Sequence, residues 1–257
     1  VEAARDGTPL RHPERETPKY RPLVAYHHFR ELLKDKEDTS HVFRIFEALP
    51  HKSFMPRVRR LVLSEQGKRL RAYEPYLPPI LDDHESLRKL PEGTVAHAYC
   101  DFMEREGLTA AGLVEASGDT RNGMGMLEDG VEWYGDRLRD THDILHILTG
   151  YGRDTLGEQC VLAFLFHQRP SPGHLFVAWA GTLLMKAKLR TEAPVLGAML
   201  EARRNGRLTS RIVEESILDL LPMQLDDVRA RLNIATPSKY LAVLDIWQKE
   251  GIDPHAF

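Results

Sequence analysis

The sequence has few cysteines, no long apolar run and little net charge, and each absence removes a class of protein. Its 257 residues include only Cys100 and Cys160, both within apolar helical patterns, so we expect buried thiols rather than disulfides or a cysteine-based zinc site. The longest nearly uncharged apolar stretches, Cys160–Phe166 and Leu175–Met185, are shorter than the ~20 residues of a membrane-spanning helix. We therefore expect a soluble or peripheral protein. A net charge of −3 argues against a nucleic-acid partner.

The first 20 residues also lack an apolar stretch. They are rich in proline and charge, so they are predicted to form an extended arm, and no signal peptide is visible in them. Because the chain begins with Val1, the question of whether a targeting segment precedes it stays open. The whole chain is 42% apolar and 28% charged, which is typical of a globular protein with a sizeable core.

Hairpin signals and internal repeats are absent, whereas helical spacing of apolar residues is nearly continuous after residue 20. The spacing predicts an all-α fold, a multi-helix bundle in one helical domain (21–234) between the arm (1–20) and a C-terminal extension (235–257). The predicted helices are 22–34, 40–49, 53–63, 84–89, 92–106, 109–117, 129–150, 155–168, 172–189, 193–205 and 225–232, with a Pro-rich connector at 76–83 and a Gly-rich one at 121–125.

Two of these helices are apolar almost all round. Residues 155–168 and 172–189 carry few charges on any face, which is typical of helices at the centre of a bundle. Plain core packing explains this composition. The sharper interpretation is that the two helices also line a tunnel for a long apolar ligand, since pockets between bundle helices are common ligand sites.

One predicted helix carries two histidines and a carboxylate at the spacing of a metal site. The segment from residue 140 to residue 158 reads DTHDILHILTGYGRDTLGE. On a helix that advances about 100° per residue, His142, Asp143 and His146 fall within one sector of about 100°. The two histidines are i and i+4 neighbours, which lets two imidazoles hold one ion from a single helix, as HExxH does in zinc proteases.

A reversal of the chain after this helix would bring in a further ligand. Gly150 and Gly152 permit a tight turn, so the following helix can run back alongside. Glu158, in the first turn of that helix, would then point at the same ion. Two imidazoles and up to two carboxylates suit Zn²⁺ or Fe²⁺ and leave positions open for water or substrate.

Each of these residues also has an ordinary alternative role. Glu158 fits a capping box with Thr155. Asp143 would equally serve as a carboxylate that orients a histidine. Arg137 and Asp140, one turn before the site, fit an i,i+3 salt bridge better than a ligand role. HDxxH alone is therefore a weak signal, which the glycine turn and the later glutamate strengthen.

Three blocks of the sequence resemble one family. YGDRLRDTHDILHILTGYGRDTLGEQCVLAFLF resembles the signature of the coenzyme Q biosynthesis protein 4 family, which is HDxxH followed by eleven residues and Glu. SLRKLPEGTVAHAYCDFMEREGL (86–108) resembles that family's helix after a Leu-Pro-x-Gly turn, and LDDVRARLNI (225–234) resembles its C-terminal element. The resemblance covers about residues 40–234, and within it Arg207–Leu221 departs from the family's pattern.

The resemblance implies an all-helical fold, with a divalent ion, Zn or Fe, bound through His142, Asp143, His146 and Glu158. It implies oxidative decarboxylation of a prenylated hydroxybenzoate at ring carbon C1, with these four residues forming the catalytic site; a role in activating O₂ favours iron. The implied partners are a polyprenylated aromatic precursor, other ubiquinone biosynthesis proteins and a membrane surface, and a homodimer stays open. The implied location is peripheral at the inner membrane, on the cytoplasmic side in a bacterium or the matrix side in a mitochondrion.

Two other functions compete with this interpretation. In the first, the protein is a non-enzymatic lipid-binding scaffold that organises the coenzyme Q biosynthetic complex, and the metal is structural. In the second, the helical His-Asp pair belongs to an HD-type metal phosphohydrolase. That chemistry needs an upstream histidine ligand, and His97 is the one candidate. Turnover of a prenylated hydroxybenzoate with O₂ uptake separates the enzyme from the scaffold.

Overall fold

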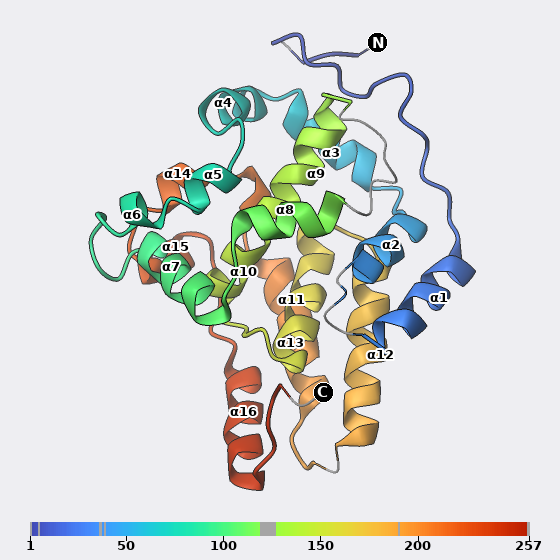
Figure 1. Ribbon diagram of the computed structural model, residues 1–257, viewed down its shortest axis with the longest axis vertical. Coiled ribbons are helices and arrows are strands. Elements are labelled where there is room, and N and C mark those ends of the chain that lie inside the picture. The colour runs from blue at the N-terminus through green and yellow to red at the C-terminus, as the bar shows by residue number, and fades with distance from the viewer. Residues whose placement is uncertain are drawn as a thin grey trace. The chain divides into compact units, whose positions relative to one another are not determined.

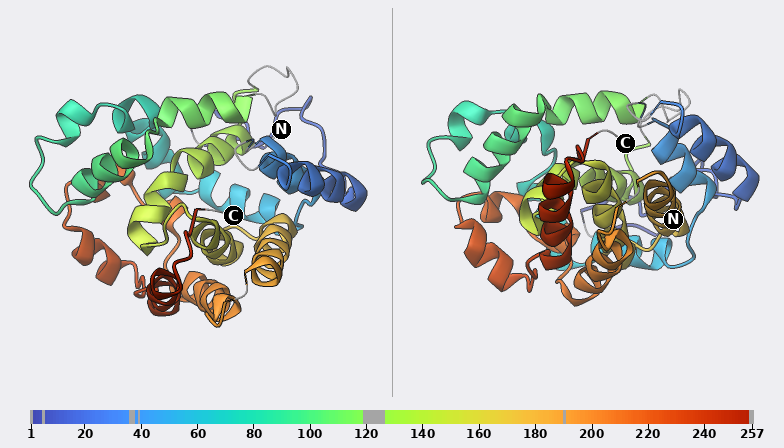
Figure 2. Two further views of the ribbon diagram at one scale, coloured as in Figure 1. Left: turned by 60° about the horizontal axis from the view of Figure 1, so that its bottom comes forward. Right: turned by 90° about the horizontal axis from the view of Figure 1, so that it is seen from below.

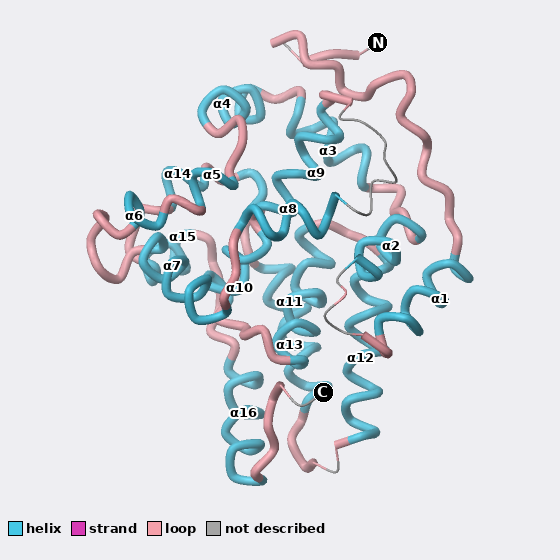
Figure 3. The backbone as a smooth tube through the Cα atoms, viewed as in Figure 1, coloured by secondary structure: helices cyan, strands magenta, loops and turns pink. Residues whose placement is uncertain are grey.

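A computed structural model describes residues 2–4, 6–35, 38, 40–118, 127–189 and 191–255. Within these ranges the regular structure is helical, and the β-type pairing consists of isolated bridges, Ala3 with Pro9 and Thr94 with Gln224. Figure 3 accordingly draws helices joined by loops. The all-α prediction is confirmed. The Gly-rich connection predicted at 121–125 lies outside the described residues.

The chain divides into two compact units. The first unit comprises residues 1–143 and 213–225, and the second comprises residues 144–212 and 226–257. The boundary falls inside one helix, so His142 and Asp143 are counted with the first unit and the remainder of that helix with the second.

The helices of the first unit are mostly short (Figure 1). They are α1 (Pro22–Leu32), α2 (Ser40–Ala48), α3 (Phe54–Val62), α4 (Glu65–Tyr73), α5 (Pro78–Leu81), α6 (His84–Leu87), α7 (Val95–Glu106), α8 (Ala110–Gly118), α9 (Gly130–Asp140) and α14 (Ile217–Leu220).

The second unit contains the three longest helices of the described residues together with shorter ones, and Figure 2 shows them from two further directions. The helices of the second unit are α10 (His142–Thr149), α11 (Thr155–Gln168), α12 (Pro172–Lys188), α13 (Val195–Leu208), α15 (Leu225–Arg231) and α16 (Ser238–Glu250). The boundary also passes through a 3₁₀ turn, η2 (Ile212–Glu214). No helix within the described residues is long and apolar enough to cross a membrane.

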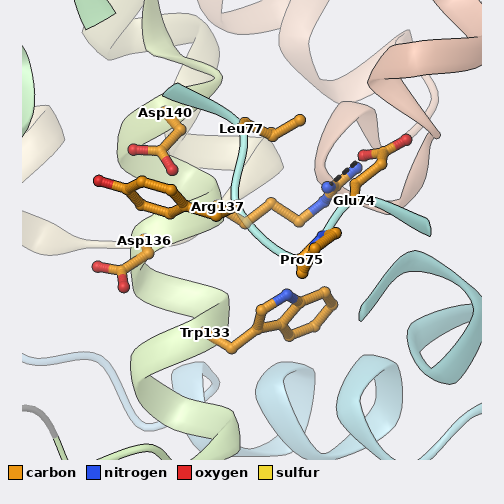
Figure 4. A pocket seen from close by; sticks show the side chains of 8 residues that line it. Glu74, Pro75, Leu77, Trp133, Asp136, Arg137 and Asp140 are labelled. Carbon is orange, nitrogen blue, oxygen red and sulfur yellow. Dashed lines mark hydrogen bonds and ion pairs between the residues drawn. The ribbon is translucent and has the colours of Figure 1, made fainter. Parts of the chain in front are cut away.

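A buried ion pair ties together three segments of the first unit. Arg137, on α9, donates from Nη1 to Glu74 at 2.7 Å and from Nε to the carbonyl of Val213 at 2.8 Å. Both side chains of the pair are almost fully buried, so each polar group needs these partners. Figure 4 shows Arg137 reaching toward Glu74 beside a cavity of about 30 Å³, which holds one or two waters and no larger ligand.

The salt bridge expected between Arg137 and Asp140 is therefore wrong. Asp140 instead accepts from its neighbour Arg139, whose Nε lies 2.7 Å from Oδ1. The i,i+3 rule describes exposed helix faces. Here the guanidinium of Arg137, which is 3% exposed, points at the buried carboxylate of Glu74 from another segment.

Helix α11 forms the centre of the second unit. It packs against α12, α13 and α16, and most of its residues are buried on every side, as its apolar composition predicts. Helix α12 is buried along one face, whereas Leu183 and Leu184 on that helix are exposed. Close approach between α11 and α13 depends on Gly206, because a Cβ there would overlap the carbonyl of Phe164.

The prediction of one helix over 129–150 is wrong in one respect, because the structure has two helices there, α9 and α10. The break falls at Thr141, whose φ of −92° and ψ of 4° leave the helical region. Its amide and its hydroxyl both donate to the carbonyl of Arg137, the hydroxyl at 2.8 Å. A threonine side chain that competes for a backbone carbonyl in this way disrupts regular helical bonding. α10 therefore begins afresh at His142.

Four helices were not predicted. α5 lies inside the Pro-rich connector, and α14 has only four residues, so neither shows a helical period. α4 is strongly polar, although Ser64 marks its start by accepting from the amide of Gly67 at 2.9 Å. α16 lies in the C-terminal extension and buries Tyr240, Val243 and Trp247, a spacing that identifies one face of a helix.

Adding one methyl group at Gly206 should separate two packed helices. We expect Gly206→Ala to lower the free energy of unfolding by roughly 2–3 kcal/mol, because the new Cβ collides with rigid backbone of α11. Gly197→Ala, on the same helix, is the control: its Cβ would meet neighbouring atoms at 3.6 and 3.7 Å, so the change should be neutral or stabilising by up to about 1 kcal/mol. Urea unfolding followed by circular dichroism measures both. Equal stability of the two variants would contradict the packing of α11 on α13.

Candidate metal centre

The turn between α10 and α11 is fixed by backbone geometry. α10 ends at Gly150, whose φ of 76° lies in the left-handed region that favours glycine, and whose amide donates to the carbonyl of His146 at 2.9 Å. At Gly152 a Cβ would lie 2.7 Å from the hydroxyl of Tyr240. At Gly157 it would overlap the carbonyl of Gly152. The reversal predicted for this segment therefore depends on glycine at three positions.

The residue that caps α11 is Asp154. Its Oδ1 accepts from the amides of Leu156 at 3.1 Å and Gly157 at 3.0 Å, and its backbone is extended, as in other N-caps. Thr155 is the first helical residue rather than the cap. The capping box considered for Thr155 and Glu158 is therefore wrong, since the aspartate one position earlier already satisfies the amides.

Three of the predicted ligands meet. The side chains of His142, His146 and Glu158 each offer one ligand atom, and these atoms all lie within 4.8 Å of one another. Nε2 of His146 lies 3.6 Å from Oε1 of Glu158. His142 and His146 come from one face of α10, as their i, i+4 spacing predicts, and Glu158 comes from the first turn of α11.

His146 is oriented by a hydrogen bond that the sequence does not reveal. It is 2% exposed, and its Nδ1 lies 3.0 Å from the carbonyl of Tyr151. A carbonyl accepts only, so Nδ1 carries a proton, and Nε2 is the ring nitrogen on the side of Glu158. A histidine that donates one ring N–H to a carbonyl and offers the other nitrogen is the usual arrangement of a metal ligand.

Asp143 does not join this group. Its carboxylate is absent from the atoms that lie within 4.8 Å of one another, although the residue is 8% exposed and sits next to His142. It faces Tyr99, the pKa of which is raised first by burial and then by the negative charge of Asp143. The geometry fits the alternative in which Asp143 supports the site rather than binding an ion directly.

The donor set suits a divalent ion. Two imidazole nitrogens and one carboxylate oxygen are ligands that Zn²⁺ and Fe²⁺ share, and three protein ligands leave coordination positions open. Arg153 lies near the carboxylate, with Nε 3.8 Å from Oε1 of Glu158, and both side chains are about one-third exposed. The centre can therefore be reached from solvent on the Glu158 side.

Two other candidates have structural explanations. Nε2 of His97 lies 2.6 Å from the carbonyl of Leu90 and 3.2 Å from that of Arg88, so this histidine holds the loop before α7 and does not reach the centre. A second group of potential ligands, His84, Cys100 and Glu104, lies within the first unit. There Glu104 is exposed and pairs with Arg88 at 2.7 Å, an ordinary surface ion pair.

The cysteines are unreactive by environment. Both are free and buried, as predicted. Burial raises the pKa of the Cys160 thiol well above its usual value, and the nearby charge of Asp154 raises it further. Burial also raises the pKa of Cys100. A thiol held protonated is a poor nucleophile, and neither cysteine belongs to the group formed by His142, His146 and Glu158.

The fold and the donor cluster define an all-helical protein with a candidate metal centre on two consecutive helices. Residues 27–238 match the family described as coenzyme Q (ubiquinone) biosynthesis protein Coq4. The chain therefore belongs to the Coq4 family.

The similar proteins carry the same description. The chain is 29% identical over 193 residues to the mitochondrial ubiquinone biosynthesis protein coq4 of Pyrenophora tritici-repentis, which covers 74% of this chain and 63% of that protein. It is 29% identical over 192 residues to COQ4 of Phaeosphaeria nodorum, covering 74% of this chain and 62% of the relative. The chain thus spans about three-fifths of the length of these relatives.

A solved structure shares the fold. The crystal structure of a putative ubiquinone biosynthesis protein from Nostoc punctiforme superposes with a TM-score of 0.59 at 22% identity, and the match covers 85% of this chain and all of that one. At this identity the likeness supports the helical fold alone.

Removing the carboxylate of the cluster should abolish tight metal binding. We expect Glu158→Ala to weaken Zn²⁺ binding by at least ~100-fold, beyond the 10–100-fold typical of residues that only support ligands. Competition against a chromophoric chelator measures the affinity. Glu192→Ala removes an exposed carboxylate of the second unit and should bind Zn²⁺ like the wild type. Unchanged affinity in Glu158→Ala would remove Glu158 from the centre.

Proposed function

We propose that the protein is a metal-dependent oxidative decarboxylase of ubiquinone biosynthesis, acting on a prenylated hydroxybenzoate. The observation that carries the proposal is the convergence of His142, His146 and Glu158 within 4.8 Å. Membership of the Coq4 family supplies the pathway. The donor set leaves room for a substrate carboxylate or phenolate, which a purely structural site would not need.

The proposed reaction replaces the ring carboxylate by a hydroxyl group. The bond between ring carbon C1 and the carboxyl carbon breaks, CO₂ leaves, and a C–O bond forms at C1. The substrate loses two electrons, which O₂ accepts to become hydrogen peroxide, and water supplies the hydroxyl oxygen. A bound divalent ion would supply Lewis acidity toward the carboxylate and, if it is iron, a path for electrons to O₂.

The protein's own residues have separate tasks in this proposal. His142, His146 and Glu158 hold the ion, with His146 kept in one tautomer by the Tyr151 carbonyl. Asp143, buried next to His142, provides negative charge that stabilises the cationic centre. The apolar surface of α12, where Leu183 and Leu184 are exposed, holds the prenyl tail, at about 0.8 kcal/mol for each CH₂ that leaves water.

The decisive experiment is turnover by purified protein. Protein loaded with Fe²⁺ and, separately, with Zn²⁺ is supplied with a prenylated 4-hydroxybenzoate derivative in the presence of O₂. We expect CO₂ release matched by O₂ uptake with Fe²⁺, and loss of both in Glu158→Ala. Tight substrate binding without CO₂ release would instead support the lipid-binding scaffold.

Helix α1 supports the further proposal that the protein works on a membrane surface. Its outward face carries large apolar side chains in contact with solvent: Leu23 is 82% exposed and Tyr26 56%, and Leu33, directly after the helix, is exposed as well. Ala25 and Phe29, on the opposite face, are buried. Exposing a leucine and a tyrosine side by side costs free energy unless a partner covers them.

The charges on this face support an anionic bilayer as the proposed partner. Lys19 and His27 flank the apolar row, and Arg30 and Lys34 lie within it, all exposed. The acidic Glu31 pairs with Lys34 at 2.7 Å, so the net positive charge of this face comes from Lys19 and Arg30. A helix with aromatic and aliphatic side chains between basic ones lies in the headgroup region of a bilayer, with its cations at the lipid phosphates.

Membrane docking by α1 can be measured without any catalytic assay. We expect Leu23→Ser/Tyr26→Ser to lower partitioning onto phosphatidylcholine–phosphatidylglycerol vesicles at least about tenfold, because two apolar side chains no longer leave water. The matched control is Leu200→Ser/Leu241→Ser, where both leucines are 44% exposed on other helices. Equal partitioning of the two double variants would refute docking through α1. Concentration-dependent dimerisation lost only in the first variant would show that a second copy covers this face.

A further inference from the structure

Tyr240 lies in the C-terminal extension, beyond the residues that match the family. It belongs to the first turn of α16 and is 2% exposed. Its hydroxyl donates to Oδ2 of Asp154 in a short hydrogen bond and accepts from the amide of Gly152 at 3.0 Å. A buried phenol with both a donor and an acceptor partner is fully satisfied, so its position is fixed.

Asp154 connects this hydroxyl to the candidate ligand Glu158. One carboxylate oxygen of Asp154 caps the first amides of α11, and the other accepts from Tyr240. The backbone carbonyl of Asp154 also accepts from the amide of Glu158 at 3.0 Å. A shift of Asp154 would therefore move the first turn of α11, and with it the carboxylate that lies 3.6 Å from His146.

A second contact links Tyr240 to the orientation of His146. The rings of Tyr240 and Tyr151 meet edge to face, with centroids 5.5 Å apart. The carbonyl of Tyr151 is the group that accepts from Nδ1 of His146. Tyr240 therefore contacts Asp154 and Tyr151, and each of these two residues is hydrogen-bonded to a candidate ligand.

We infer that Tyr240 is a positioning residue for the metal centre: from α16 it holds Asp154 and Tyr151 so that Glu158 and His146 face one another. The inference rests on the proposed metal centre and adds a supporting residue that the family signature does not contain. The phenol stays protonated in this role, since burial and the charge of Asp154 both raise the pKa of Tyr240. It therefore donates to Asp154 throughout the neutral range.

The test removes one oxygen atom. In the full-length chain, Tyr240→Phe should weaken Zn²⁺ binding 10- to 100-fold, the range typical of residues that hold ligands in place. At saturation with Co²⁺, the visible absorption spectrum should also shift, because the ligand geometry changes. The matched control is Tyr134→Phe, which removes the hydroxyl of a buried tyrosine in the first unit and should leave affinity and spectrum unchanged.

A second variant tests the same hydrogen bond from its other end. Asp154→Asn keeps an oxygen for the helix cap but weakens the bond to Tyr240, so its effect on Zn²⁺ affinity should overlap that of Tyr240→Phe. The double variant should then lose less affinity than the two single losses combined.

Each outcome has a distinct meaning. If Tyr240→Phe lowers the unfolding free energy but retains wild-type Zn²⁺ affinity and Co²⁺ spectrum, Tyr240 is only a core residue and the inference is refuted. If the wild type itself binds no stoichiometric metal, the proposed centre fails, and the inference fails with it. Circular dichroism of each variant confirms that the helices are retained.

Discussion

The candidate centre depends on the hydrogen bonds that the buried carboxylate of Asp154 accepts. A helix leaves its first amides without internal partners, and α11 begins in a buried environment where water does not satisfy them. Asp154 accepts from two of these amides and from the Tyr240 hydroxyl, and it is 4% exposed. The start of α11, and therefore the position of Glu158, is thus determined by a buried side chain outside the HDxxH and Glu signature.

Close approach of backbone is the second constraint. The turn between α10 and α11 folds so tightly that Gly152 and Gly157 leave no space for a Cβ, and Gly206 allows α13 to approach α11 in the same way. Glycine in a helix costs about 1 kcal/mol relative to alanine, so its presence at positions 157 and 206 is explained by packing rather than by helix formation. These contacts hold α11 closely against its neighbours, which the candidate ligand in its first turn would require.

The proposed reaction and the proposed docking of α1 on a bilayer fit together. The proposed substrate, an aromatic acid with a long prenyl tail, partitions into a bilayer, so the proposed reaction would take place at a lipid surface. The described helices are too short or too polar to span a membrane, whereas α1 presents leucine and tyrosine among cations. The proposed peripheral attachment through α1 needs no buried charge to enter the lipid.

The sequence by itself determined the helical class, most helix positions and the pairing of His142 with His146, because these depend on local periods of 3.6 residues. It also pointed to Glu158, through the glycines that permit a reversal. Only the tertiary structure decided which groups surround these ligands. Asp143 stands apart from the cluster, Arg137 pairs with Glu74 rather than Asp140, and Tyr240 reaches Asp154 from 86 residues away. Such contacts join residues far apart in the chain, and no local pattern encodes which buried polar groups will satisfy one another.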